Sequence, residues 1–149
     1  MTVRLVYLDV CALCRPFDDQ GFLRIRLETD AVNLVLAKVR DGKFKLAVSP
    51  VHKKEITAIS DFYERSELLS LLDHYGEHLQ ADTQLAMARA NELFALGFGV
   101  ADAAHVAFAE QCGSDFVSCD DKLLKLCRRN NVATRFGDPV LFCMKENLR

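Results

Sequence analysis

The sequence predicts an α/β fold in which helices cover both faces of a central parallel sheet of four or five strands. Short apolar runs alternate along the chain with longer stretches whose apolar residues recur at helical spacing. This alternation is typical of β–α–β units, which build parallel sheets within three-layer α/β/α folds. The chain has 149 residues and is 50% hydrophobic, enough for one ordinary core, so we expect a single domain over residues 1–149.

The first half of the chain is expected to contain two strands and three helices. One helix is indicated by apolar residues at i, i+3, i+4 and i+7. Another is indicated by Ser49 and Pro50, which supply an N-cap hydroxyl and a proline at the first helical position. The expected elements are a strand at 3–8, a loop at 15–21, a helix over 22–40 ending at 41–42, a strand at 44–48, a helix from 50, a helix over 62–75 and a short extended piece near 79.

The second half is divided by glycines. Gly97 and Gly99 interrupt one helical stretch, and Gly113 with Ser114 forms a turn before the next apolar run. The expected elements are a helix over 82–96, an alanine-rich helix over 102–111, a strand at 115–119, a helix over 121–129 and a last strand near 133–136. We assign no element to the residues after Pro139.

The composition favours a cytoplasmic protein. No apolar run reaches the ~18 residues that a membrane span needs. Asp9 follows the first apolar run too early for the core of a signal peptide. We therefore expect the six cysteines to be reduced thiols that pack as small hydrophobic side chains. The net charge of −2 neither requires nor excludes a polyanionic partner.

Four acidic residues lie where predicted strands end or predicted helices begin. Asp9 and Asp120 end apolar runs, Glu55 follows a third run, and Asp102 opens the alanine-rich helix. The carboxyl ends of parallel strands meet at one edge of a sheet, so these side chains are expected to converge. Carboxylates that share a site repel one another unless a cation joins them, and oxygen ligands suit Mg²⁺ or Mn²⁺. The set predicts a metal-dependent enzyme acting on phosphate.

Each of these residues also has a purely structural interpretation. Asp102 and Asp120 suit helix N-caps, and Glu55 suits a solvated helix face. Asp9 is harder to explain this way, because it follows a strongly apolar strand and a buried carboxylate without partners is costly. Capping and metal binding are compatible, so both interpretations stay open for the aspartates.

The order of the motifs resembles that of the PIN-domain nucleases, a family that includes the toxin ribonucleases of bacterial toxin–antitoxin pairs. The resemblance covers nearly the whole chain. It is carried by Asp9 after the first strand, Glu55 after the second, the segment Asp102-Ala-Ala-His-Val-Ala, and Ser118-Cys119-Asp120 after the fourth.

The resemblance implies a PIN-like fold and a ribonuclease that cleaves single-stranded or structured RNA and leaves a 5′ phosphate. Bound Mg²⁺ or Mn²⁺ would activate the attacking water and stabilise the leaving oxygen. Ser118 would orient a ligand or a water, and Arg15 and Lys122 would meet substrate phosphates. The implied catalytic and metal-binding residues are Asp9, Glu55, Asp102 and Asp120. The implied partners are an RNA substrate, a cognate antitoxin protein and a second copy of the chain in a homodimer, with no membrane.

Three residues depart from this pattern or compete with it. Cys11 stands where the family usually has a polar residue, and its thiol is a weak hydrogen-bonding substitute. Asp121 adjoins Asp120, and either is a possible ligand; the Ser-x-Asp frame favours Asp120, with Asp121 capping the next helix. His105 is expected to be a packed, hydrogen-bonded residue outside the site.

Three other functions remain alternatives. Cys11 and Cys14 form a CxxC pair after a strand, as in thioredoxin-like oxidoreductases, or half of a zinc site. A haloacid-dehalogenase-like phosphatase also begins with a strand-terminal aspartate, but it needs a second aspartate where Cys11 stands. The third alternative is a catalytically impaired PIN fold that binds RNA or a protein without cutting.

Overall fold

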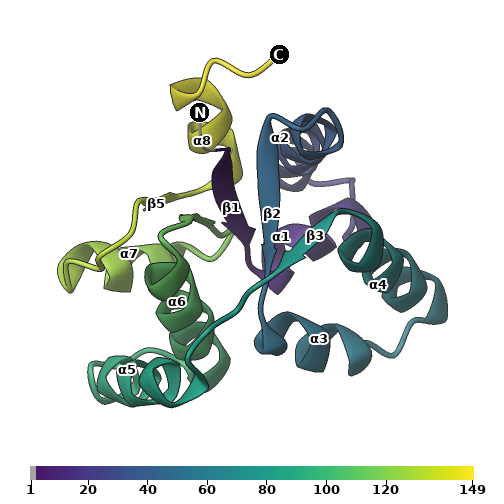
Figure 1. Cartoon of the computed structure of the whole chain (residues 1–149). Coiled ribbons are helices and arrows are strands. Elements are labelled where there is room, and N and C mark those ends of the chain that lie inside the picture. Colours follow the sequence, from purple (N-terminus) through teal and green to yellow (C-terminus); the bar gives the residue numbers. More distant parts are fainter. Residues whose placement is uncertain (1–2) are drawn as a thin grey trace.

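The computed structural model describes residues 3–149 and contains one sheet of five parallel strands (Figure 1). The strands lie in the order β3-β2-β1-β4-β5. Their bounds are β1 (Arg4–Leu8), β2 (Phe44–Val48), β3 (Gly76–His78), β4 (Asp115–Val117) and β5 (Phe136–Gly137). The N-terminal strand is central: Val6 pairs with Leu46 of β2, and Tyr7 pairs with Phe116 of β4. The predicted α/β class with a parallel sheet is confirmed.

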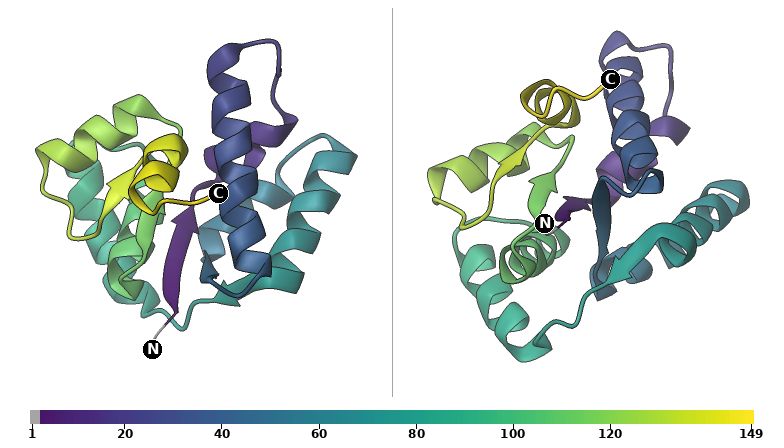
Figure 2. Two further views of the ribbon diagram at one scale, coloured as in Figure 1. Left: turned by 90° about the horizontal axis from the view of Figure 1, so that it is seen from above. Right: turned by 45° about the horizontal axis from the view of Figure 1, so that its top comes forward.

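Helices cover both faces of this sheet, as the two views of Figure 2 show. One face packs against α1, α2, α4 and α8, and the other against α5, α6 and α7. The helices are α1 (Val10–Cys14), α2 (Leu23–Arg40), α3 (Pro50–Thr57), α4 (Phe62–Tyr75), α5 (Thr83–Ala95), α6 (Val100–Cys112), α7 (Asp121–Arg129) and α8 (Pro139–Lys145), with a short 3₁₀ helix at Arg15–Phe17.

The central strand shows how the sequence divides the core into two halves. Val6 and Leu8 belong to the cluster that contains α2 and α4, whereas Tyr7 belongs to the cluster that contains α5 and α6. All three side chains are fully buried. Successive side chains of a strand point to opposite faces, so a nearly continuous apolar run is what a strand covered on both sides requires.

Most predicted elements are confirmed within one or two residues at each end. The prediction missed two helices. Asp9 begins the short α1 directly after β1, and Asp138 with Pro139 begins α8, with the Asp138 side chain accepting the Leu141 N–H at 2.8 Å. The second helix carried an ordinary start signal, an aspartate followed by proline.

Three boundaries differ in ways that matter. Helix α6 begins at Val100 with Gly99 as its N-cap, so Asp102 lies within the first turn and the capping interpretation of Asp102 is wrong. The extended piece predicted near Leu79 is β3, which ends at His78, and the last strand is Phe136–Gly137 rather than residues 133–136. Across residues 3–149, no helix has the length and apolarity that crossing a membrane demands.

Candidate active site

The carboxyl edge of the sheet gathers most of the predicted site residues. Asp9 joins β1 to α1, and Asp120 immediately precedes α7 on the chain leaving β4. Glu55 lies on α3, the helix that follows β2 at the foot of the sheet in Figure 1. Asp102 lies in the first turn of α6, a helix that contacts α3.

Asp9 is buried and tied to the backbone. Its side chain is the N-cap of α1: Oδ1 accepts the Ala12 N–H at 3.0 Å and the Cys11 thiol at 3.1 Å. The residue is only 3% exposed. Burial raises the pKa of the Asp9 carboxyl well above its usual value, and a hydrogen bond from Ser118 partly opposes that rise. The predicted burial of Asp9 is therefore found, together with partners that lower its cost.

The pKa of Asp102 is influenced by the charges of other carboxylates. Partial burial raises its pKa, and the charges of Asp120 and then Glu55 raise it further. Asp120 is itself fixed as the N-cap of α7, where Oδ1 accepts the N–H groups of Lys122 and Leu123 at 3.0 and 3.1 Å. Like charges held together in this way favour a proton or a cation between them.

Asp120 and its sequence neighbour Asp121 have different hydrogen-bond partners. The Asp121 carboxylate receives two hydrogen bonds from the Arg24 guanidinium, at 2.7 and 2.8 Å, which lowers its pKa. Asp120, not Asp121, caps α7. The expected capping role of Asp121 is therefore wrong, and of the two aspartates Asp120 is the one whose charge raises the pKa of Asp102.

Cys11 and Ser118 link the carboxylates of the two central strands. The Cys11 thiol donates to Asp9 and lies 3.5 Å from the Ser118 hydroxyl, which in turn accepts the Asp120 N–H at 3.0 Å. The Cys11 thiol thus makes the hydrogen bond to Asp9, in the position where we expected a thiol to be a weak substitute for a polar group. Ser118 is fully buried, as suits a residue that joins the segments of Asp9 and Asp120.

A buried hydrogen-bond chain, which the sequence did not reveal, leads from the sheet to Glu55. The His105 ring bonds the Glu55 carboxylate through Nε2 and the Tyr7 hydroxyl through Nδ1, the latter at 2.6 Å. The Tyr7 hydroxyl lies 2.7 Å from the Ser49 hydroxyl. His52 completes the group: its Nδ1 accepts the Ser49 N–H at 3.0 Å and its Nε2 donates to the Leu8 carbonyl at 2.7 Å.

This hydrogen-bond chain agrees with the interpretation of His105 and changes that of Glu55. His105 is a packed, hydrogen-bonded residue, as predicted, and is 2% exposed. Glu55 is not a freely solvated helix residue, because His105 holds it. Ser49 is the N-cap residue of α3, but its hydroxyl turns to Tyr7.

A cavity of about 440 Å³, lined by three cationic and two anionic side chains, opens beside Asp120. Its walls include Arg15, Arg24 and Lys122, and the exposed ring of Phe22. Glu28, which is buried, lies between the two arginines: its Oε1 is 3.0 Å from Arg15 Nε and 3.4 Å from Arg24 Nε. Arg15 and Lys122 were predicted to face a substrate, and Phe22 and Arg24 are additions from the structure.

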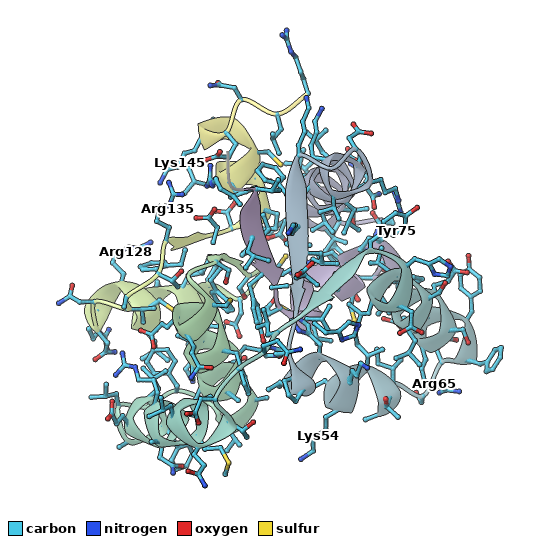
Figure 3. The ribbon with its side chains drawn as sticks, viewed as in Figure 1. Lys54, Arg65, Tyr75, Arg128, Arg135 and Lys145 are labelled. Atoms are coloured by element: carbon cyan, nitrogen blue, oxygen red, sulfur yellow. The ribbon has the colours of Figure 1, made fainter. Side chains whose placement is uncertain are left out.

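A smaller cavity of about 190 Å³ lies at the other edge of the sheet. It is lined by Arg4 and Asp115, where β1 and β4 begin, and by Arg135 and Lys145, which lie on the same side of the molecule in Figure 3. Asp115 is already paired with both Arg4 and Arg135. This cavity contains none of the predicted site residues.

The carboxylates do not form a closed ligand cage. Within residues 3–149, no three His, Cys, Asp or Glu side chains are arranged as a ready metal-binding cluster. The donor set nevertheless fits Mg²⁺ or Mn²⁺. Carboxylate oxygens and waters are the ligands that these hard cations take, and a cation would relieve the repulsion that, after burial, raises the pKa of Asp102.

The cysteines do not support redox chemistry. All six are free thiols. A hydrogen bond with the Cys119 thiol, followed by burial, raises the pKa of Cys11, and burial raises the pKa of Cys14 to about 12. Reactive cysteines have a lowered pKa instead.

Comparison with known proteins supports the fold but gives no family. No family model matches the sequence, and no curated protein matches it. Among solved structures, the chain is similar to FitAcB from Neisseria gonorrhoeae, with a TM-score of 0.53 and 12% sequence identity, over 90% of this chain and 97% of that one. At this identity the similarity concerns the fold alone, and it supports the PIN-like fold predicted from the sequence.

Proposed function

We propose that the protein is a ribonuclease that depends on Mg²⁺ or Mn²⁺ and cleaves single-stranded or structured RNA. The observation that carries the proposal is the placement of Glu55, Asp102 and Asp120 near the carboxyl ends of the strands; burial and the charges of Asp120 and Glu55 also raise the pKa of Asp102. These residues come from different helices at the carboxyl edge of a parallel sheet, where active sites of α/β folds form. Asp9 completes the set from the central strand.

Different residues of the protein would have different roles in hydrolysis. Asp9, Asp102 and Asp120 would hold the metal, with Glu55 bound directly or through a water. When bound, the metal supplies an activated water and stabilises charge on the leaving oxygen. Cys11 and Ser118 fix the orientation of Asp9 through the hydrogen bonds described above.

The cavity beside Asp120 would be the path of the RNA strand. Lys122, together with the ion-paired Arg15 and Arg24, places positive charge beside Asp120, which suits the phosphates that flank the scissile bond. Phe22, 62% exposed at the start of α2, offers a flat apolar face on which an unpaired base can stack. A base within a duplex cannot reach such a face, so this surface favours single-stranded segments.

The proposal is tested by a cleavage assay on end-labelled single-stranded RNA. Wild-type protein with Mg²⁺ or Mn²⁺ is expected to cut the RNA, and the products are expected to carry a 5′ phosphate, detectable by adaptor ligation. Excess EDTA is expected to stop cleavage, and added Mn²⁺ to restore it. An inert wild type, or cleavage that persists in EDTA, contradicts the proposal. Metal binding in calorimetry without cleavage favours the alternative of a catalytically impaired binding module.

Cys11 provides a more specific prediction. Cys11→Ser keeps a donor for the Asp9 carboxylate and is expected to retain cleavage. Cys11→Val has a similar size but no donor, and we expect it to lower the cleavage rate by about tenfold, the lower end of the range for losing a partner that orients a ligand. Cleavage rates at saturating Mn²⁺ make the comparison. Equal rates in both variants show that the thiol contact has no role.

The resemblance to PIN-domain toxins extends the proposal to partners. We infer that an antitoxin protein binds this chain and that the chain forms a homodimer in solution. Co-purification with the product of a neighbouring small gene tests the first, and light scattering of the purified protein tests the second. A genome neighbourhood without such a gene counts against the toxin–antitoxin role.

A further inference from the structure

The hydrogen-bond chain that ends at Glu55 has a definite direction. The Glu55 carboxylate only accepts hydrogen bonds, so His105 Nε2 donates to it. In a neutral imidazole the other nitrogen then accepts, which makes the Tyr7 hydroxyl the donor at 2.6 Å. The Tyr7 oxygen in turn accepts from the Ser49 hydroxyl at 2.7 Å. With His105 neutral, every donor in the chain therefore points toward Glu55.

The members of this chain are rigidly held. Tyr7, Ser49 and His105 are each at most 2% exposed. The His105 ring packs edge-on against Tyr7 and His52, with ring centroids 5.5 and 5.0 Å away. Of the described residues, none has a buried side-chain nitrogen or oxygen without a hydrogen-bond partner. A fully satisfied buried network specifies one arrangement, and here that arrangement fixes the His105 ring.

Glu55 itself is different, because it is the one partly exposed member. Its side chain is 35% exposed and comes from the middle of α3, where a glutamate has many rotamers. The charge of Glu55 reaches Asp102, so its position matters to the electrostatics of the site. The contact with His105 is the only hydrogen bond found for the Glu55 carboxylate within residues 3–149.

We propose that Tyr7 and His105 are positioning residues, which select the rotamer in which Glu55 faces the metal-binding carboxylates. The inference rests on the proposed function for its consequence in catalysis, but the positioning itself is a property of the metal-free protein. His105 acts through Nε2 as a fixed donor, and Tyr7 keeps that proton on Nε2 by donating to Nδ1. Partners that orient ligands in this way are commonly worth about 10- to 100-fold in metal affinity or activity.

The test compares Tyr7→Phe, His105→Leu and His105→Gln with the wild type. Tyr7→Phe removes one oxygen, and His105→Gln keeps an amide donor for Glu55 whereas His105→Leu does not. Calorimetry is expected to show Mn²⁺ affinity reduced about tenfold or more in Tyr7→Phe and His105→Leu, and partly restored in His105→Gln. In the metal-free protein, ¹⁵N NMR is expected to find the His105 proton on Nε2 in the wild type and a mixture of tautomers in Tyr7→Phe.

Two controls separate positioning from loss of stability. Leu72 is 1% exposed and lies on the opposite face of the sheet from the hydrogen-bond chain. Leu72→Val therefore lowers stability without changing that hydrogen-bond chain, and it is expected to leave Mn²⁺ affinity unchanged. In a Glu55→Gln background, Tyr7→Phe is expected to cause no further loss of Mn²⁺ affinity, because its effect passes through the carboxylate. Additive losses, or wild-type affinity in both Tyr7→Phe and His105→Leu, overturn the inference. An inert wild type that still shows these affinity changes refutes only the nuclease function.

Discussion

Asp9→Asn and Asp102→Asn are each expected to reduce RNA cleavage by about a hundredfold or more, and to make the protein more resistant to unfolding. Both carboxyl groups have a raised pKa because of burial, and at Asp102 neighbouring charges add to this. Ionising either carboxyl group in the folded protein therefore costs folding free energy, and asparagine removes that cost while keeping the shape. At position 9 the asparagine oxygen still caps α1 by accepting the Ala12 N–H.

Cleavage rates in Mn²⁺ and thermal unfolding in EDTA measure the two effects. Asp73→Asn is the matched control, since Asp73 is exposed on α4, away from the carboxyl edge. This variant is expected to match the wild type in both measurements. If Asp9→Asn or Asp102→Asn cuts RNA at the wild-type rate, the residue concerned is not part of the catalytic set. A fall in both activity and stability identifies it as structural.

The second large effect is acid destabilisation through His52. Burial lowers the pKa of His52 to about 3, from 6.5 for a solvated histidine, and the nearby His105 adds to the shift. Between these pH values the unfolded chain binds a proton that the folded protein does not. Stability therefore falls as the pH falls from 6.5 toward 3, by about 1.4 kcal/mol per pH unit for this one group.

His52→Gln isolates this contribution. Asp9 and Asp102 act in the opposite direction, because with a raised pKa the folded protein keeps protons that the unfolded chain loses. The wild type and His52→Gln both contain Asp9 and Asp102, so a difference in the pH dependence of their stability is caused by His52. Urea unfolding at several pH values from 7 to 4 is expected to give a steeper loss of stability in the wild type. Parallel curves would show that the pKa of His52 is the same in the folded and the unfolded protein.

The apolar character of the buried strands predicts both the layered fold of this protein and the positions of the acidic residues at the strand ends. Strands buried on both faces are apolar throughout, so an acidic residue at their end stands out without any knowledge of the fold. Asp9 and Asp120 were found in this way. Helix starts are less secure: the capping rules placed the start of α6 at Asp102, but Gly99, which has no side-chain cap, begins it.

What the sequence does not reveal depends on contacts between distant segments. Nothing near Tyr7 in the sequence distinguishes it from the other apolar residues of β1, yet its hydroxyl joins residues 42 and 98 positions away. Arg24 likewise reaches Asp121 across 97 positions, which gives Asp121 a partner that Asp120 does not share. Pairings of this kind follow from the register of the sheet and leave no local pattern.

The position of β1 at the centre of the sheet has a consequence for the timing of synthesis. This strand is made before the other strands of the sheet, and its neighbour β4 follows so much later that Arg4 bonds Asp115 across 111 positions. A chain emerging from the ribosome therefore holds Asp9 and Glu55 long before Asp102 and Asp120 exist to join them. Contacts so distant in sequence form slowly and near the end of folding. The nascent protein is thus without all four of these acidic residues until Asp120 has been translated.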